Sequence, residues 1–136
     1  MDPPLSPSRA GARTEAAVAS ALARRGFDVY LPAFSVNGRV DLVYDRGGHL
    51  VRVQCKTARS HGATLAFHTT SLTNNMARAY DGEIDEFGVY APATGLVYLV
   101  PIGAAPKHTC FLRTEPAGNG QTAGVRWAAD YELGPP

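Results

Sequence analysis

Cysteine is scarce in this 136-residue chain, which holds only Cys55 and Cys110. Two cysteines are too few for a disulfide framework, and Cys55 falls on the apolar side of an alternating segment, so we interpret both as reduced thiols. The four histidines are scattered along the chain and there is no Cys-x-x-Cys pair, which argues against a structural zinc site.

Long apolar runs and an excess of one charge are also missing. No uninterrupted apolar run approaches about 18 residues, and no charged segment followed by an apolar one opens the chain, so the sequence predicts neither a membrane span nor a secretory signal. The formal net charge is only +1, so any basic surface must be local. We therefore expect a cytoplasmic protein without a membrane partner.

The composition and length fit one globular domain. Hydrophobic residues make up 45% of the chain and charged residues 18%, which is ordinary for a soluble domain. A chain of 136 residues buries one real core but would leave two separate domains marginal. We predict a flexible arm rich in proline and serine at residues 1–10, followed by a single domain at residues 11–136.

The periodicity of the chain predicts a helix followed mainly by strands. An alanine-rich segment with arginines in its last turn and Gly26 as a stop predicts a helix at 12–26. A second, short helix is a candidate at 74–82. Alternating or apolar runs predict strands at 27–32, 39–45, 49–59, 64–70, 86–92, 96–102 and 109–114, while 125–133 is ambiguous.

The hairpin between the strands at 39–45 and 49–59 fixes a register. The Gly-Gly pair at 47–48 suits a two-residue type I′ turn. Asp41 then lies opposite Gln54 and Arg39 opposite Lys56, while apolar residues fill the other face. Directly opposed Cβ atoms lie roughly 4.5–5.5 Å apart, close enough for a carboxylate and an amide oxygen to bind one hard cation. The alternative is a polar face simply exposed to solvent.

Glu15 is placed on the apolar stripe of the first helix. It shares the i, i+3, i+4, i+7 pattern with Val18, Ala19 and Leu22. A buried carboxylate needs a partner, and Lys56 or a cation at Asp41 would supply one. Alternatively, Glu15 rotates to solvent or pairs with Arg39.

These segments resemble a known family. The runs "GFDVYLP", "GRVDLVYD", "VRVQCKTAR" and "YDGEIDEFGVYAP" are similar to the core of the PD-(D/E)xK nuclease superfamily, which includes type II restriction enzymes and archaeal Holliday-junction resolvases. Within it, they resemble the small endonucleases associated with group I introns, in which glutamine replaces the acidic residue of the third motif. The resemblance covers roughly residues 12 to 102. It implies an α/β fold with a restriction-endonuclease-like core, a central mixed β-sheet flanked by helices in the order αβββαβ.

The resemblance also implies roles for individual residues. Asp41 would be the principal metal ligand, with the side-chain oxygen of Gln54 and the backbone carbonyl of Cys55 as further ligands. Lys56 would orient the attacking water or stabilise charge on the phosphate, and Glu15 would be an outer or second-metal carboxylate. The expected ion is Mg²⁺, with Mn²⁺ as an alternative. Val40 stands where the motif's name has proline.

The chemistry of these residue types agrees with those roles. Phosphodiester hydrolysis needs an activated water and a cation to offset developing charge. Mg²⁺ prefers oxygen ligands and retains several waters, so two or three protein oxygens suffice. Because Gln54 supplies an oxygen but no charge, the sequence suggests weaker metal binding or a single tightly held ion.

Further residues are candidates for contacts with DNA. A polar segment after the catalytic strand is well placed to reach phosphates or bases. Tyr80 and Asp85 lie in the resembling downstream segment, but a packed tyrosine and a helix-terminal aspartate explain them as well, and we assign them no catalytic role. The candidate DNA contacts are Arg39, Arg59, His61 and His68, with plain surface positions as the alternative for the last three.

The leading hypothesis is a Mg²⁺-dependent DNA endonuclease of the homing or restriction type. Duplex cleavage requires two strand scissions and a small domain offers limited contact area, so we expect a homodimer or higher oligomer. A Holliday-junction or repair nuclease is an alternative within the enzyme class. The neutral Gln54 and the near-zero net charge leave open a module that binds nucleic acid without cutting it.

Overall fold

One long helix opens the fold. The computed structural model describes residues 4, 6–34, 38–73, 76–116, 118–120 and 122–136. Helix α1 spans Pro7–Arg24, with Ser6 as N-cap accepting a hydrogen bond from the Arg9 amide at 3.4 Å. The helix therefore begins at Pro7 rather than at residue 12, so residues 7–10 of the predicted flexible arm are helical. Gly26, at φ 87°, follows its end as expected.

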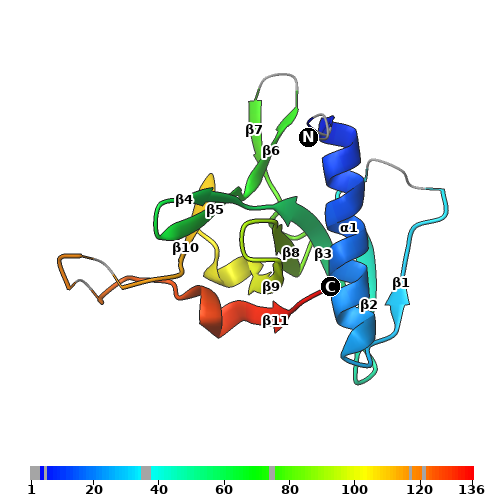
Figure 1. Ribbon diagram of the computed structural model, residues 1–136. Helices are drawn as coiled ribbons and strands as arrows, with labels where there is room; N and C mark the ends of the chain where they lie inside the picture. The colour runs from blue at the N-terminus through cyan, green and yellow to red at the C-terminus, as the bar shows by residue number, and fades with distance from the viewer. Residues whose placement is uncertain (1–3, 5, 35–37, 74–75, 117, 121) are drawn as a thin grey trace.

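A six-stranded mixed sheet forms the centre of the molecule (Figure 1). Only the β3–β8 pair is parallel among the described ladders of this sheet, and the other pairs are antiparallel. This confirms the predicted α/β core with a central mixed sheet. In spatial order the strands are β1 (Val29–Tyr30), β2 (Leu42–Arg46), β3 (His49–Thr57), β8 (Glu86–Ala91), β9 (Leu96–Pro101) and β11 (Glu132–Gly134).

The crossover from β3 to β8 consists of strands instead of the predicted second helix. Residues 74–75 of that helix lie outside the described residues, but Met76–Ala79 forms strand β7, which pairs with β6 (Thr70–Thr73). Strands β4 (Arg59–His61), β5 (Thr64–His68) and β10 (Thr109–Arg113) form a separate three-stranded sheet. The remaining elements are the 3-10 helices η1 (Ile102–Ala104) and η2 (Ala128–Tyr131). Within the described residues α1 is thus the one α-helix, and no helix there is both long and apolar enough to cross a membrane.

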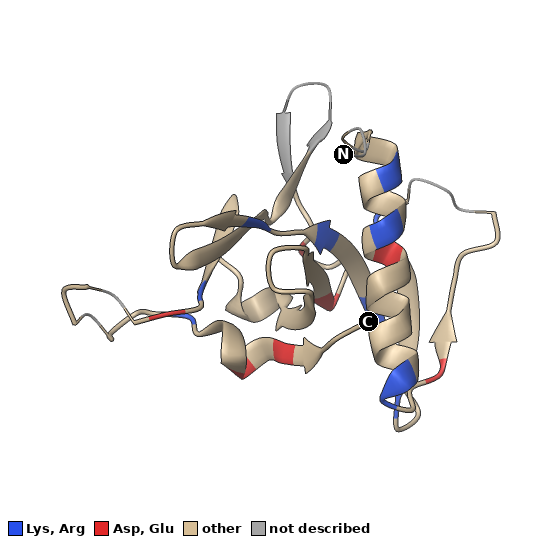
Figure 2. Cartoon of the chain, viewed as in Figure 1, with Lys and Arg blue, Asp and Glu red and all other residues tan. Residues whose placement is uncertain are grey.

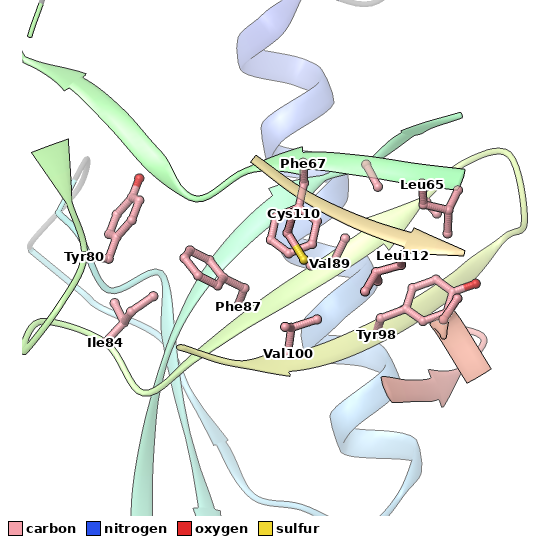
Figure 3. Packing of buried hydrophobic residues seen from close by; sticks show 13 residues of the cluster. Leu65, Phe67, Tyr80, Ile84, Phe87, Val89, Tyr98, Val100, Cys110 and Leu112 are labelled. Atoms are coloured by element: carbon pink, nitrogen blue, oxygen red, sulfur yellow. The ribbon is translucent and has the colours of Figure 1, made fainter. Parts of the chain in front are cut away.

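The central sheet is covered on both faces. Buried residues of α1, including Val18 and Leu22, pack on one face against Val53. On the other face the three-stranded sheet contributes apolar side chains that meet those of β8 and β9. Figure 3 shows Leu65, Phe67, Cys110 and Leu112 of the small sheet lying close to Phe87, Val89, Tyr98 and Val100.

The hairpin of β2 and β3 has the predicted register. Gly47 and Gly48 both have positive φ, at 61° and 90°, as a type I′ turn requires. The pairing runs from Arg46↔His49 to Leu42↔Val53. At Asp41 the backbone N–H donates to the Val53 carbonyl at 2.8 Å. Val53 is already the partner of Leu42, so the chain slips by one residue there, and Asp41 is not directly opposite Gln54 as predicted.

Gly88 sets how closely α1 approaches the sheet. A Cβ atom at this position would lie 2.6 Å from Val18 Cγ1 and 2.9 Å from Val53 Cγ1. Both neighbours are fully buried and branched, so neither has space to move away. The absence of a side chain at Gly88 therefore allows the helix that carries Glu15 to lie directly on the strands that carry the site.

We expect Gly88→Ala to lower the free energy of unfolding by about 1–3 kcal/mol, the usual cost of overpacking. Thermal or urea unfolding measures this loss. Val18→Ala in the same chain should recover part of it, because it removes the methyl groups that the new Cβ meets. Gly103→Ala, with open space around its Cβ, is the matched control. Equal stabilities for Gly88→Ala and Gly103→Ala would contradict the close approach.

Candidate active site

Asp41 is anchored to strand β3 by hydrogen bonds on either side of Gln54. Its backbone N–H donates to the Val53 carbonyl, and its Oδ2 accepts a hydrogen bond from the Cys55 N–H at 2.7 Å. Because both neighbours of Gln54 are bonded to Asp41, the carboxylate and the glutamine are held at the same point of the sheet. After the slip in register, Asp41 therefore remains bonded to the strand that carries Gln54.

The surroundings of the Asp41 carboxyl group disfavour its ionised form. Its pKa is raised from 3.8 to about 6, chiefly by burial and also by the negative charge of Glu15, while the Cys55 N–H and Lys56 act in the opposite direction. Glu15 itself is exposed, and the buried positions near it on α1 are Thr14, Ala17 and Val18. The expected inward direction of Glu15 is therefore wrong, but its carboxylate still reaches Asp41 from the rim of the helix.

Lys56 is held by residues that the sequence did not connect with it. Its Nζ donates to the Tyr80 hydroxyl at 3.0 Å and lies 3.5 Å from the Thr70 carbonyl. It also lies 4.8 Å from the centre of the Tyr80 ring. Tyr80 is 3% exposed and packs edge-on against Phe87, so it is a rigid support. Tyr80, to which the sequence gave no role, therefore fixes the lysine head group.

Arg39 is bound inside the protein and does not face Lys56 in a ladder. Its guanidinium lies 3.6 Å from the centre of the Tyr80 ring and forms an ion pair with Glu83 at 3.1 Å. It also donates to Ser71 and to the Ala79 carbonyl. These contacts join the segment before Asp41 to the segment that carries Tyr80. Arg39, which the sequence offered as an alternative partner for Glu15, forms an ion pair with Glu83.

The remaining predicted residues lie outside this centre. Arg59 and His61 are exposed on β4, and His68 is exposed at the end of β5. Asp85 binds the Arg52 side chain through both carboxylate oxygens, at 3.1 and 3.0 Å, and this contact lowers the Asp85 pKa. Asp85 thus fastens β3 to the start of β8 and does not terminate a helix.

Comparisons with known proteins agree with this arrangement. The family model described as PD-(D/E)XK endonuclease matches residues 5–134. The chain belongs to this family. Among solved structures, a bacterial homing endonuclease has a TM-score of 0.69 and 19% sequence identity, over 94% of this chain and 87% of that one. No curated protein sequence matches significantly. The predicted nuclease superfamily and its restriction-endonuclease-like core are therefore confirmed.

The metal that PD-(D/E)xK nucleases typically use fits the oxygen atoms present here. No cluster of three His, Cys, Asp or Glu side chains suited to a metal occurs within the described part of the chain. Gln54 Oε1, however, is buried without a hydrogen-bond partner. The amide orientation is set by Nε2, which lies 3.4 Å from the Cys55 carbonyl that accepts its hydrogen bond. A buried oxygen left unsatisfied costs about 1–3 kcal/mol, and a hard cation would satisfy it.

The sulfur of Cys55 is not part of such a donor set. Cys55 is buried, and burial together with the charge of Asp41 raises the pKa of its thiol. A thiol that stays protonated is a poor ligand for any metal. Its backbone is the functional part, because the N–H positions Asp41 and the carbonyl lies beside Gln54. In this member of the PD-(D/E)XK endonuclease family the candidate ligands are therefore all oxygens.

The raised pKa of Asp41 predicts a stability that depends on pH. The pKa rises from 3.8 on folding to about 6, so the folded state favours the protonated acid, and this contribution is lost as pH rises through about 6. Asp41→Asn keeps an acceptor for the Cys55 N–H but cannot ionise. In EDTA at pH 8 it should be more stable than the wild type by roughly 1 kcal/mol, after allowance for solvent screening, or about 3–5 °C in Tm.

This advantage should largely disappear at pH 4, where Asp41 is protonated in the folded state and partly protonated in the unfolded chain. Scanning calorimetry at the two pH values measures it, with Asp130→Asn at an exposed position of η2 as the control. If Tm differed between Asp41→Asn and the wild type by the same amount at pH 4 and pH 8, the ionised Asp41 carboxylate would not be destabilising.

Proposed function

We propose that this protein is a divalent-metal-dependent endonuclease that hydrolyses phosphodiester bonds in DNA. The observation that carries the proposal is the orphaned, buried Oε1 of Gln54 beside the raised-pKa carboxyl of Asp41. Two oxygen groups in these states are costly to a folded chain, and one bound cation would relieve both. Membership of a nuclease family and the fold of a bacterial homing endonuclease support the same function.

The chain's own residues have distinct parts in this reaction. Asp41, Gln54 and the Cys55 carbonyl would hold Mg²⁺ or Mn²⁺, with Glu15 at the rim. When bound, the ion supplies positive charge that offsets the charge developing on the phosphate. The Lys56 head group is fixed by the Tyr80 hydroxyl at 3.0 Å. Its positive charge would orient the attacking water or neutralise the phosphate oxygen.

We further propose that the active form is a homodimer or higher oligomer. One set of Asp41, Gln54 and Lys56 side chains cuts one strand, whereas a double-strand break requires two sets. The cytoplasm is the expected location. Among possible substrates we favour duplex DNA over four-way junctions, because the fold match is to a homing endonuclease.

Cleavage should require both the metal and Lys56. Supercoiled plasmid incubated with the protein should be cut in Mg²⁺ or Mn²⁺ and remain intact in EDTA. Lys56→Ala should reduce cutting at least 100-fold, as expected for a group acting only on the transition state. Lys107→Ala, at an exposed lysine, is the control. Equal cutting by the wild type and Lys56→Ala, or cutting in EDTA, would contradict the proposal.

Tyr80→Phe should lower the cleavage rate at saturating DNA about tenfold without changing KM. The variant keeps the ring that packs on Arg39 and Phe87 but removes one hydrogen bond to a charged group, usually a net 1.5–3 kcal/mol. Tyr98→Phe removes a buried hydroxyl that lies 3.2 Å from Thr94 and serves as the matched control. Single-turnover kinetics measures the cleavage rate of each variant. Identical rates for both variants would show that Tyr80 only fills the core.

A further inference from the structure

The three-stranded sheet has one face that no side chain of the central sheet covers. Its strands pair antiparallel, with Arg59↔Ala66 and Phe111↔Ala66 in one row across the sheet. Because side chains alternate along each strand, the buried residues Leu65, Phe67, Cys110 and Leu112 all point to the central sheet (Figure 3). The opposite surface, called here the outer face, carries Arg59, His61, His68, Phe111 and Arg113.

The outer face is basic and lacks acidic residues. Strands β4, β5 and β10 read RSH, TLAFH and TCFLR, without a single Asp or Glu. In a protein of net charge +1, this local concentration of cationic and protonatable groups is distinctive. Figure 2 shows blue segments on β4 and at the end of β3, whereas red segments lie on β11 and just before it; α1 carries both colours. The face is thus complementary to a polyanion.

The arginines of this face are not neutralised by carboxylates among the described residues. Arg59 Nη1 lies 3.3 Å from His68 Nε2. Because a guanidinium only donates, the Arg59 side chain is the donor in this contact and Nε2 the acceptor. Arg113 donates from Nε to the Glu115 carbonyl at 3.0 Å, which leaves its terminal nitrogens directed elsewhere. Both side chains therefore retain N–H groups for phosphate oxygens.

An exposed aromatic ring stands beside these cations. Phe111 is 49% exposed although it lies in the middle of a strand. Ala66, between Phe111 and Arg59, is only 1% exposed, so its neighbours close over it and make a continuous surface. A ring next to guanidinium and imidazole groups suits a nucleotide, because it stacks on a sugar or base while the cations contact the phosphates.

The outer face begins close to the candidate active site. Arg59 follows Lys56 by three residues, or about 10 Å along an extended chain, roughly three base pairs of duplex. The end of β3 is fixed to α1 by the hydroxyl groups of Thr14 and Thr57, 2.6 Å apart. The distance between the face and Lys56 is therefore set by the fold.

We propose that the outer face binds the phosphate backbone of the DNA on one side of the cleaved bond, with Phe111 packed against a sugar or base. The inference rests on the proposed function and deepens it, because it identifies the surface that holds the substrate beyond the site of cutting. The sequence predicted contacts for Arg59, His61 and His68. It could not connect them with Phe111 and Arg113, which join them only through the pairing of β5 with β10.

The test is DNA binding without cleavage. Fluorescence anisotropy in EDTA measures the Kd of the full chain for a labelled duplex over a series of salt concentrations. Arg59→Ala should weaken binding about tenfold and reduce the slope of log Kd against log salt by about one. Phe111→Ala should weaken binding roughly fivefold or more while leaving the salt slope unchanged, because it removes stacking and not charge.

Two matched variants control for nonspecific effects. Arg24→Ala removes an exposed arginine at the other end of α1, and Phe34→Ala removes a ring that is 96% exposed in the β1–β2 connection. Both should bind as the wild type does, and calorimetry confirms that all four variants are folded. Binding by Arg59→Ala and Phe111→Ala equal to that of the controls would overturn the outer-face proposal while leaving the cleavage function standing. A wild type that neither binds nor cuts DNA would overturn both.

Discussion

The hydrogen bond from the Cys55 N–H to the Asp41 carboxylate, 2.7 Å long, is the contact on which the candidate site depends. It joins the start of β2 to the strand that carries Gln54 and Lys56, at a point where the hairpin ladder has already slipped by one residue. Without it, Asp41 would turn to solvent. With it, a carboxyl group is held half-buried beside Glu15, and its pKa rises to about 6. The fold therefore maintains an unfavourable group where a cation would make it favourable, as functional sites commonly do.

Lys56 is held by a second set of contacts. Tyr80 bonds to the lysine head group, and Arg39 stacks on Tyr80 and pairs with Glu83. This set joins the segment before Asp41 to the turn before β8. Since β8 is also the parallel neighbour of β3, both sides of the site are fixed to one rigid unit. Gly88 completes that unit, because its missing side chain lets the buried side of α1 lie against the sheet, with Glu15 exposed at the rim.

The sequence was informative where structure is local. The Gly-Gly turn and strict alternation predicted the β2–β3 register from Arg46 to Leu42, but they did not predict the slip at Asp41. Glu15 was misplaced because the apolar stripe of α1 includes the small polar Thr14, which hydrophobic periodicity does not detect. The helix predicted at 74–82 failed because neighbouring strands, rather than local propensity, decide the conformation of Met76–Ala79. Tyr80 and Phe111 were inaccessible to sequence reasoning, since their partners lie 24 and 45 residues away in the chain.

The most direct test of the account is a crystal structure with Mn²⁺, located by anomalous scattering. The account predicts one Mn²⁺ ion, seen as a single strong anomalous peak. Its ligands should be Asp41 and Gln54 Oε1, each oxygen at about 2.1–2.2 Å from the ion. The peak should be absent in Asp41→Asn crystals grown in the same way. A peak elsewhere, or a Gln54 oxygen that remains unbound at saturating Mn²⁺, would contradict the claim that this buried oxygen exists to hold the metal.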